Sequence, residues 1–334
     1  MKILITGVAG FIGFHLAKRL INEKYSIVGI DNLNDYYDKK LKLNRLKELG
    51  IVKNLSFEVS KINPNFSFQK LDINEEEKLN VLFKKNNFEI VIHLAAQAGV
   101  RYSLINPKSY IQTNVNGFYN VIQNCRINNI KSFIYASSSS VYGLNENLPY
   151  DEFSNTDNPI SLYAATKKSN ELIAHSYSHI YGLKTIGLRF FTVYGPWGRP
   201  DMAYYKFSNL ILNNKPINIY NNGLNFRDFT YIDDIINGLE KIIKKIPKEN
   251  FNIFNLGNNK SVSLIDFITI LEKNLNKNAV KRFIEAQKGD VNRTWANIDK
   301  AKEIFLFEPN TSIEFGLKKF CKWFLSYEKI YKKN

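Results

Sequence analysis

Short apolar runs alternate with longer segments of helical spacing through the first 190 residues. The apolar runs of strand length cover residues 3–5, 26–30, 66–71, 90–94, 133–136 and 185–190. Between them, apolar residues recur at helical spacing and share one face, as do Ile12, Leu16 and Leu20, and further on Ile111, Val115, Phe118 and Ile122. Strand–helix alternation of this kind predicts a parallel sheet covered by helices on both faces.

Two regions depart from this pattern. Residues 34–65 are charged and rich in tyrosine; within them, 41–49 predicts a helix and 54–65 an irregular excursion. After residue 195 the alternation loosens, and we predict helices at 202–213, 233–245 and 264–276. We therefore expect an α/β fold in which residues 1–195 form a doubly wound parallel sheet and residues 196–334 form a smaller α/β lobe. The boundary is expected to be interleaved rather than a clean linker.

The composition is that of a globular protein. Of the 334 residues, 44% are hydrophobic, and no apolar run reaches transmembrane length. The N-terminus lacks the charged and apolar regions of a signal peptide. Cys125 and Cys321 are far apart and have no metal-ligand spacing, which predicts two reduced thiols in a cytoplasmic protein and no metal site.

A formal net charge of +15 raises the question of polyanion binding. The lysines are spread along the chain, the basic runs are short, and no nucleic-acid-binding motif accompanies them. We therefore assign most of this charge to solvated helix faces and expect neither a nucleic-acid nor a membrane partner. Some arginines are expected to bind an anionic small substrate.

A glycine motif follows the first predicted strand and opens the first predicted helix. Gly7 permits a tight turn, Gly10 leaves room for a pyrophosphate at the helix N-terminus, and Gly13 lets helix and strand pack closely. Asp31 ends the second strand, where its carboxylate can accept both ribose hydroxyls and repel a 2′-phosphate. The context predicts a Rossmann-type site that binds NAD rather than NADP. The Gly-x-x-Gly-x-x-Gly spacing is a feature of short-chain dehydrogenase/reductases.

A second constellation carries the acid–base chemistry. Tyr163 and Lys167 are four residues apart and share a helix face. A nearby cation lowers the pKa of a phenol, so Tyr163 could take a proton from a sugar hydroxyl. The serine-rich run 137–143 follows the fifth apolar run, at the strand end where ligands bind in open α/β sheets.

These motifs resemble extended short-chain dehydrogenase/reductases and, within them, nucleotide-sugar 4-epimerases. The resemblance covers residues 1–325 and is closest to bacterial and plant UDP-glucuronate 4-epimerases. It is carried by residues 31–38, 95–103, 137–143, 163–168, 189–202 and 227–234. It implies that Tyr163 is the base, that Lys167 tunes it and holds the nicotinamide ribose, and that Ser138 is the catalytic Ser/Thr. It also implies a homodimer formed through the helix that carries Tyr163.

By the same resemblance, C4 of the sugar passes a hydride to bound NAD while Tyr163 removes the 4-hydroxyl proton. The 4-keto sugar then rotates and receives the hydride on its other face. Asp72 matches the position that contacts adenine, and Asn114 an asparagine that supports the cofactor site. The residues expected to bind NAD are Gly7, Gly10, Phe11, Ile12, Gly13, Asp31, Asn32, Asp72, Ile73, Leu94, Ala95, Ala96, Asn114, Tyr163 and Lys167.

A uronate substrate adds a hazard, because a C4 ketone lies β to the C5 carboxylate and invites loss of CO₂. We expect Ser139, Ser140 and Thr192 to hold this carboxylate with hydroxyl hydrogen bonds, and Arg199 and Arg101 to supply charge. Related decarboxylases and dehydratases carry an acidic residue before the Val-Tyr-Gly segment, where this chain has only serine.

The UDP half of the substrate is expected in the C-terminal lobe. Arg227 matches a family arginine near the diphosphate, where a charge-assisted hydrogen bond is expected. Gln287 and Asp290 match a region near the uridine. The family's usual Ala-Asp is Ala296-Asn297 here, which weakens the transfer of residue roles nearby.

Two other functions remain open on the sequence. A 4-epimerase of UDP-galactose or UDP-N-acetylhexosamines would keep Tyr163, Lys167 and Ser138 but would not need a carboxylate site. A non-catalytic NAD-sensing or nucleic-acid-binding protein is supported only by the net charge.

Overall fold

The structure is a computed structural model, which describes residues 1–23, 25–53, 57–285 and 291–331. The chain divides into two compact units of interleaved segments. The first unit comprises Met1–Leu144, Asn155–Phe190 and Leu239–Phe254. The second unit comprises Asn145–Ser154, Phe191–Gly238 and Asn255–Asn334. Among the described residues, no helix is long and apolar enough to cross a membrane.

The six predicted strands all form and lie in one sheet. They are β1 (Lys2–Thr6), β2 (Ser26–Asp31), β4 (Phe66–Lys70), β5 (Ile90–His93), β6 (Ser132–Ser138) and β7 (Thr185–Phe190). Their spatial order is β4-β2-β1-β5-β6-β7, and all pairs are parallel. The strand order reverses between β1 and β5, which is where ligands bind in doubly wound folds.

Two strands extend this sheet beyond the prediction. β3 (Glu58–Val59) pairs antiparallel with β4, so part of the expected irregular excursion 54–65 is a strand; residues 54–56 lie outside the described residues. β12 (Phe251–Leu256) joins the other edge, beside β7. Its sequence, FNIFNL, has two buried asparagines among its apolar residues, so it lacks the continuous apolar run from which the other strands are predicted.

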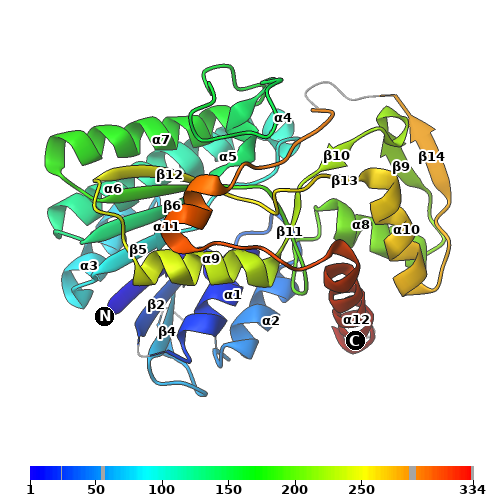
Figure 1. The fold of residues 1–334 in the computed structure, drawn as a ribbon. Helices are drawn as coiled ribbons and strands as arrows, with labels where there is room; N and C mark the ends of the chain where they lie inside the picture. The colour runs from blue at the N-terminus through cyan, green and yellow to red at the C-terminus, as the bar shows by residue number, and fades with distance from the viewer. Residues whose placement is uncertain (24, 54–56, 286–290, 332–334) are drawn as a thin grey trace. The chain divides into compact units, whose positions relative to one another are not determined.

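Helices cover both faces of the sheet in the first unit, as predicted (Figure 1). Helices α1 (Phe11–Leu20) and α2 (Lys39–Glu48) lie on one face. The other face is covered by α3 (Glu76–Asn86), α6 (Phe118–Ile127) and α7 (Leu162–Tyr181). The short elements α4 (Tyr102–Ile105), α5 (Pro107–Tyr110) and η2 (Ser139–Tyr142) stand near the carboxyl ends of the strands.

The prediction that Ile111, Val115, Phe118 and Ile122 share one buried helix face is wrong in part. Phe118 and Ile122 are buried, but Ile111 is 43% exposed. The reason is that Ile111–Gly117 forms a π-helical segment, η1, whose wider turns change the phase of the helix face.

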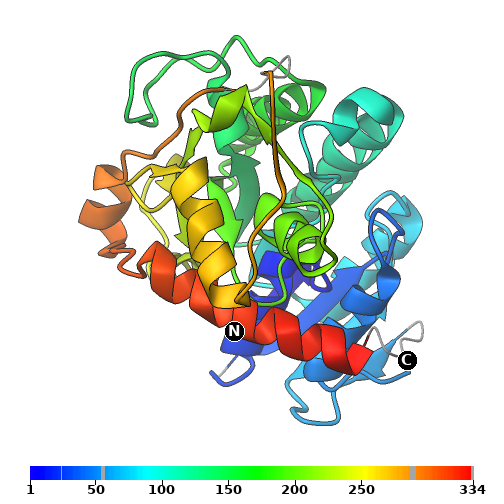
Figure 2. The ribbon, with the colours of Figure 1, turned by 90° about the vertical axis from the view of Figure 1, so that its right-hand side faces the viewer.

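The second unit contains helices and short strand pairs. Its helices are α8 (Ala203–Leu212), the first turns of α9 (Ile232–Lys244), α10 (Leu264–Leu275), α11 (Asp299–Phe305) and α12 (Ile313–Tyr331). Figure 2 shows α10 lying against α12. The strands pair as β8 (Thr192–Tyr194) with β11 (Phe229–Tyr231), β9 (Ile217–Tyr220) with β14 (Lys281–Ile284), and β10 (Phe226–Arg227) with β13 (Val262–Ser263). A short turn, η3, covers Asn221–Gly223. The three helices predicted in this region form at the expected places.

Candidate active site

The glycine turn joins β1 to α1. Gly7 has φ +72° and, with Val8, donates its backbone N–H to the Ile30 carbonyl. A Cβ at Gly13 would lie 2.3 Å from the Gly7 oxygen, so only glycine allows this approach of helix and strand. Gly10 is the N-cap of α1 and makes no side-chain capping bond. The helix therefore begins with backbone N–H groups that suit an anion.

Asp31 stands at the end of β2, as predicted, and is 8% exposed. Its carboxylate accepts hydrogen bonds from the backbone N–H groups of Ala9 at 3.2 Å and Leu33 at 2.8 Å. These bonds fix it beside the glycine turn. Asn32 donates to Asp72 at 2.8 Å, which brings two further residues of the predicted cofactor set together.

Two buried cations of α2 support this region and were not predicted. Lys42 lies 3.9 Å from the Asp31 carboxylate, and burial lowers the pKa of Lys42, with Asp31 acting against this fall. Arg45 is fully buried and donates to the Ala9 carbonyl at 2.9 Å and to Tyr37 at 2.7 Å. Lys42 and Arg45 are three residues apart and so share one helix face. The segment carries many other charged residues, so this spacing alone did not indicate that these two are buried.

The loop after β5 carries the predicted residues Leu94, Ala95 and Ala96. The backbone N–H of Ala95 donates to the Thr6 hydroxyl at 3.1 Å, which holds this loop against the glycine turn. Asn114, in η1, is 1% exposed. Its amide bonds both backbone groups of Gln97 and, at 3.1 Å, the Thr166 hydroxyl of α7. Asn114 thus ties the loop to α7.

The remaining predicted cofactor residues lie along the same edge of the sheet. Phe11 and Ile12 open α1, and Ile73 is buried just beyond Asp72. The helix start, the carboxylate of Asp31 and the loop after β5 all stand at the carboxyl ends of parallel strands. This donor and acceptor set fits a dinucleotide.

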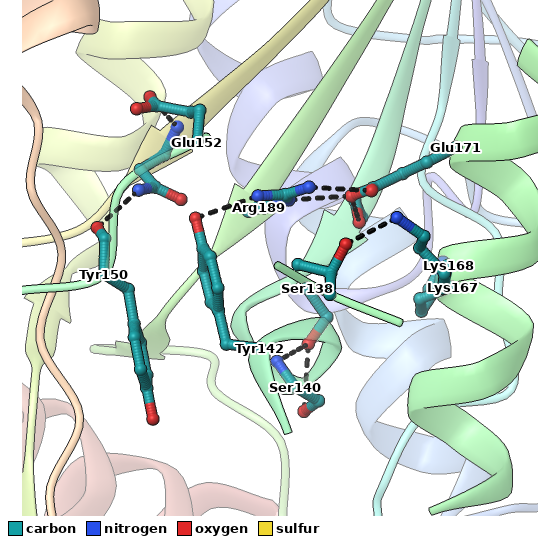
Figure 3. Close-up of polar contacts among 12 residues, drawn as sticks. Ser138, Ser140, Tyr142, Tyr150, Glu152, Lys167, Lys168, Glu171 and Arg189 are labelled. Carbon is teal, nitrogen blue, oxygen red and sulfur yellow. Dashed lines mark hydrogen bonds and ion pairs between the residues drawn. The ribbon is translucent and has the colours of Figure 1, made fainter. Parts of the chain in front are cut away.

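Lys167 and Ser138 approach the same strand end from two elements (Figure 3). The Lys167 ammonium donates to the Ala136 carbonyl of β6 at 2.8 Å. Burial lowers the pKa of Lys167 to about 8, and the carboxylate of Glu171 opposes this shift. The hydroxyl of Ser138, at the end of β6, accepts the Ser140 N–H at 3.2 Å.

Tyr163 lies in the first turn of α7, which the Ser161 side chain caps by accepting the Ala164 N–H. The ring of Tyr163 is half-buried and packs edge to face with the ring of Tyr110, with 6.1 Å between the ring centroids. One helical turn separates it from Lys167, as the sequence spacing predicts. The structure therefore places the predicted base Tyr163, the Lys167 cation and the serine turn, residues 137–143, in the first unit.

The residues expected near the uronate carboxylate lie in both units. Ser139 and Ser140 are half-buried in η2, and Arg101 is exposed before α4. In the second unit, Thr192 opens β8, and Arg199 forms a two-bond ion pair with Asp201 at 2.5 and 3.0 Å.

Arg227 lies on β10 and donates to the carbonyls of Phe226 at 2.9 Å and Asn292 at 3.2 Å. Its neighbour Asp228 was not predicted, although it is fully buried. The Asp228 carboxylate accepts from the Thr230 hydroxyl and the backbone N–H groups of Asn258, Asn259 and Ala296. Burial raises the pKa of Asp228 to about 6 although these bonds oppose the rise. Gln287 and Asp290 lie outside the described residues.

Comparison with known proteins agrees with this geometry. Residues 3–257 match the model of the NAD dependent epimerase/dehydratase family. The protein CapI of Staphylococcus aureus is 47% identical over 98% of this chain and all of its own length. UDP-glucuronate 4-epimerase 4 of Arabidopsis thaliana is 46% identical over 98% of this chain and 76% of its own.

A solved structure has a similar fold. The UDP-glucuronic acid 4-epimerase of Bacillus cereus, crystallised with UDP-glucuronic acid and NAD, superposes with a TM-score of 0.89. It is 34% identical, and the match covers 98% of this chain and 99% of that one. With its glycine turn, buried Asp31 and tyrosine–lysine–serine set, this chain belongs to the NAD-dependent epimerase/dehydratase family.

Proposed function

We propose that this protein interconverts UDP-glucuronate and UDP-galacturonate by inverting C4, with NAD as bound cofactor. The observation that carries this proposal is the serine turn. Lys167 donates to the Ala136 carbonyl of β6, Ser138 ends that strand, and only hydroxyl side chains follow Ser138 before Val141. The likeness to UDP-glucuronate 4-epimerases supports the choice of substrate.

The residues of this chain divide the acid–base work. When bound, NAD⁺ accepts the hydride from C4 and returns it. Tyr163 takes the proton of the 4-hydroxyl as the ketone forms and gives it back to O4 when the alcohol is restored. The ammonium of Lys167, one helical turn away, stabilises the phenolate of Tyr163. The Ser138 hydroxyl, next to Ser140, can donate a hydrogen bond to O4.

A carboxylate must be held away from the geometry that releases CO₂. Hydroxyl groups suit this task because they bind the carboxylate without protonating it. Ser139 and Ser140 offer such groups in the first unit, and Thr192 offers one in the second. Arg199 offers charge, although in this structure its guanidinium is bonded to Asp201. We retain Arg101, Arg227, Gln287 and Asp290 as proposed substrate residues.

The nearest competing function is C4 inversion of a neutral UDP-sugar. The two are separated by incubating the enzyme with UDP-glucuronate, UDP-glucose and UDP-N-acetylglucosamine in turn and following each reaction by proton NMR. We expect UDP-galacturonate to form and little decarboxylated pentose. Turnover of a neutral sugar with UDP-glucuronate left intact would replace our substrate assignment.

We also propose a homodimer in a reducing, cytoplasmic environment. Both cysteines are free and buried, as the sequence predicts for reduced thiols. The outer faces of α6 and α7 expose large apolar side chains, including Tyr119 and Leu172. Such faces are typical of subunit contacts. Sedimentation equilibrium tests the assembly, and a Leu172→Lys variant is expected to be monomeric.

A further inference from the structure

A buried ion pair lies directly behind the predicted catalytic residues. Glu171 of α7 and Arg189 of β7 are each only 3% exposed. The guanidinium binds both carboxylate oxygens at 2.9 Å, a two-bond geometry (Figure 3). Ser137 donates its hydroxyl to the same carboxylate at 2.6 Å, and Arg189 donates to the Tyr142 hydroxyl at 3.1 Å.

This pair connects the elements that carry the site. Glu171 lies one helical turn after Lys167 in α7. Ser137 directly precedes Ser138 in β6, and Tyr142 ends the turn that contains Ser139 and Ser140. Replacing a buried ion pair by apolar residues is often neutral or stabilising, so stability alone is a weak reason for its presence. A role in positioning accounts for its contacts better.

The charged and titratable groups around Lys167 also favour a positioning role for this ion pair. Glu171 is the carboxylate that acts against the burial of Lys167. On β5, His93 is neutral because burial lowers its pKa to about 3, and on β6 burial raises the pKa of Tyr135. Arg189 on β7 contributes a positive charge, which opposes the ammonium form of Lys167. Tyr163 is the titratable side chain one turn before Lys167 on α7. Within the part of the chain that the structure describes, Glu171 is therefore the group whose field favours the ammonium form of Lys167.

We propose that Glu171 and Arg189 are a positioning pair for C4 inversion: they fix α7 against the serine turn and keep a carboxylate one helical turn behind the Lys167 ammonium. The inference rests on the proposed function and adds two residues that need not touch the substrate. Glu171 raises the pKa of Lys167 and so keeps it charged beside Tyr163. Arg189 partly neutralises Glu171 and so limits this rise.

Two single variants test the pair because they change the field at Lys167 in opposite directions. Glu171→Gln preserves the shape of the side chain but removes its negative charge, so the pKa of Lys167 falls. The loss of kcat on the alkaline side then moves to lower pH. Arg189→Gln leaves the carboxylate unpaired, so the alkaline loss of kcat moves to higher pH. A fall of one unit in the pKa of Lys167 lowers kcat on the alkaline side about tenfold. KM for UDP-glucuronate should change little in either variant.

A second measurement does not require turnover. In protein labelled with ¹³C at the lysine ε-carbon, the signal lost in Lys167→Met identifies Lys167, and its titration reports that pKa directly. We expect the titration to shift down in Glu171→Gln and up in Arg189→Gln. Glu89→Gln is the matched control, because Glu89 pairs with Lys131 on the surface of the same unit and should leave Lys167 unchanged.

The outcomes separate the possible roles. Equal losses of kcat at every pH with an unshifted Lys167 signal would mean that the pair only packs the core, and would overturn the proposal. If the single variants do not fold, the double variant Glu171→Gln/Arg189→Gln carries the test. It should still lower the pKa of Lys167, and an unchanged value contradicts us. If wild-type enzyme leaves UDP-glucuronate intact, the proposed function fails while the titration still tests the pair.

Discussion

Lys167 shows how burial determines chemistry at the scale of one residue. The same ammonium on the surface would titrate near 10.5, whereas burial brings its pKa to about 8. In the proposed mechanism, Lys167 is the cation that stabilises the Tyr163 phenolate, so the lowered pKa of Lys167 sets the upper pH limit of that role.

Replacing Tyr163 by phenylalanine should abolish epimerisation and leave NAD bound. The ring hydroxyl is the only group removed, and general acid–base catalysis contributes about 10²- to 10⁴-fold to rate. Proton NMR measures turnover, and the NAD released on denaturing the purified variant measures cofactor content. Substantial residual turnover at neutral pH would remove Tyr163 from the role of base.

Arg199→Ala tests charge recognition of the substrate. We expect kcat/KM for UDP-glucuronate to fall by about tenfold to a hundredfold, because a hydrogen bond between charged groups contributes roughly 1.5–3 kcal/mol. Any slow activity on UDP-glucose should be unaffected. Asp201→Asn is the informative companion, because it releases the Arg199 guanidinium from its present partner. An equal loss on both sugars would assign Arg199 to loop structure instead.

Tyr135→Phe should leave stability unchanged or raise it. The Tyr135 hydroxyl is fully buried and has no hydrogen-bond partner among the described residues. Tyr110→Phe is the matched control, because the Tyr110 hydroxyl donates to the Ala98 carbonyl at 2.9 Å. Loss of that bond should cost about 1 kcal/mol. Urea unfolding compares the two, and a larger loss for Tyr135→Phe would show that its hydroxyl is satisfied in solution.

At the scale of elements, irregular backbone positions two side chains that each join several segments, Asn114 and Asp228. Asn114 lies in the π-helical segment η1 and bonds both the loop after β5 and helix α7. Asp228 lies between β10 and β11 and accepts hydrogen bonds from two other segments of the second unit. Neither element has a simple repeating pattern, so the sequence did not indicate how many partners these residues join.

Asp228→Asn should destabilise the second unit by about 2–4 kcal/mol, because an amide cannot accept from every donor that the carboxylate serves and leaves buried N–H groups unpaired. KM for the UDP-sugar should also rise, since Arg227 is the adjacent residue. Differential scanning calorimetry and steady-state kinetics measure the two effects. Asp299→Asn, on the exposed start of α11, is the charge-matched control.

At the scale of the whole molecule, distant parts of the chain complete the first unit. Residues Leu239–Phe254 belong to it. Glu240 of α9 pairs with Arg19 of α1 at 2.9 Å, and the backbone N–H of Thr185 donates to the Asn250 carbonyl just before β12. The assignment of residues 1–195 to the cofactor and 196–334 mainly to the sugar nucleotide remains a prediction.

The net charge of +15 leads to a prediction about the whole chain. If the lysines only cover solvated helix faces, a DNA or RNA fragment should be retarded at low salt and released at physiological salt. A gel-shift titration with sodium chloride measures this. Tight binding that persists at physiological salt would favour the nucleic-acid-binding alternative over a small anionic substrate.

The sequence by itself determined the repeating strand and helix pattern, the glycine turn and the spacing of Tyr163 and Lys167. These features are local: each follows from periodicity or from the conformations that a residue type allows. Only the tertiary structure decided which charges are buried together. Glu171 and Arg189 lie on a helix and a strand, as do Lys42 and Asp31, and the pairing of each depends on how the helices pack on the sheet. The serine turn has its proposed chemistry because that packing places Lys167 beside it.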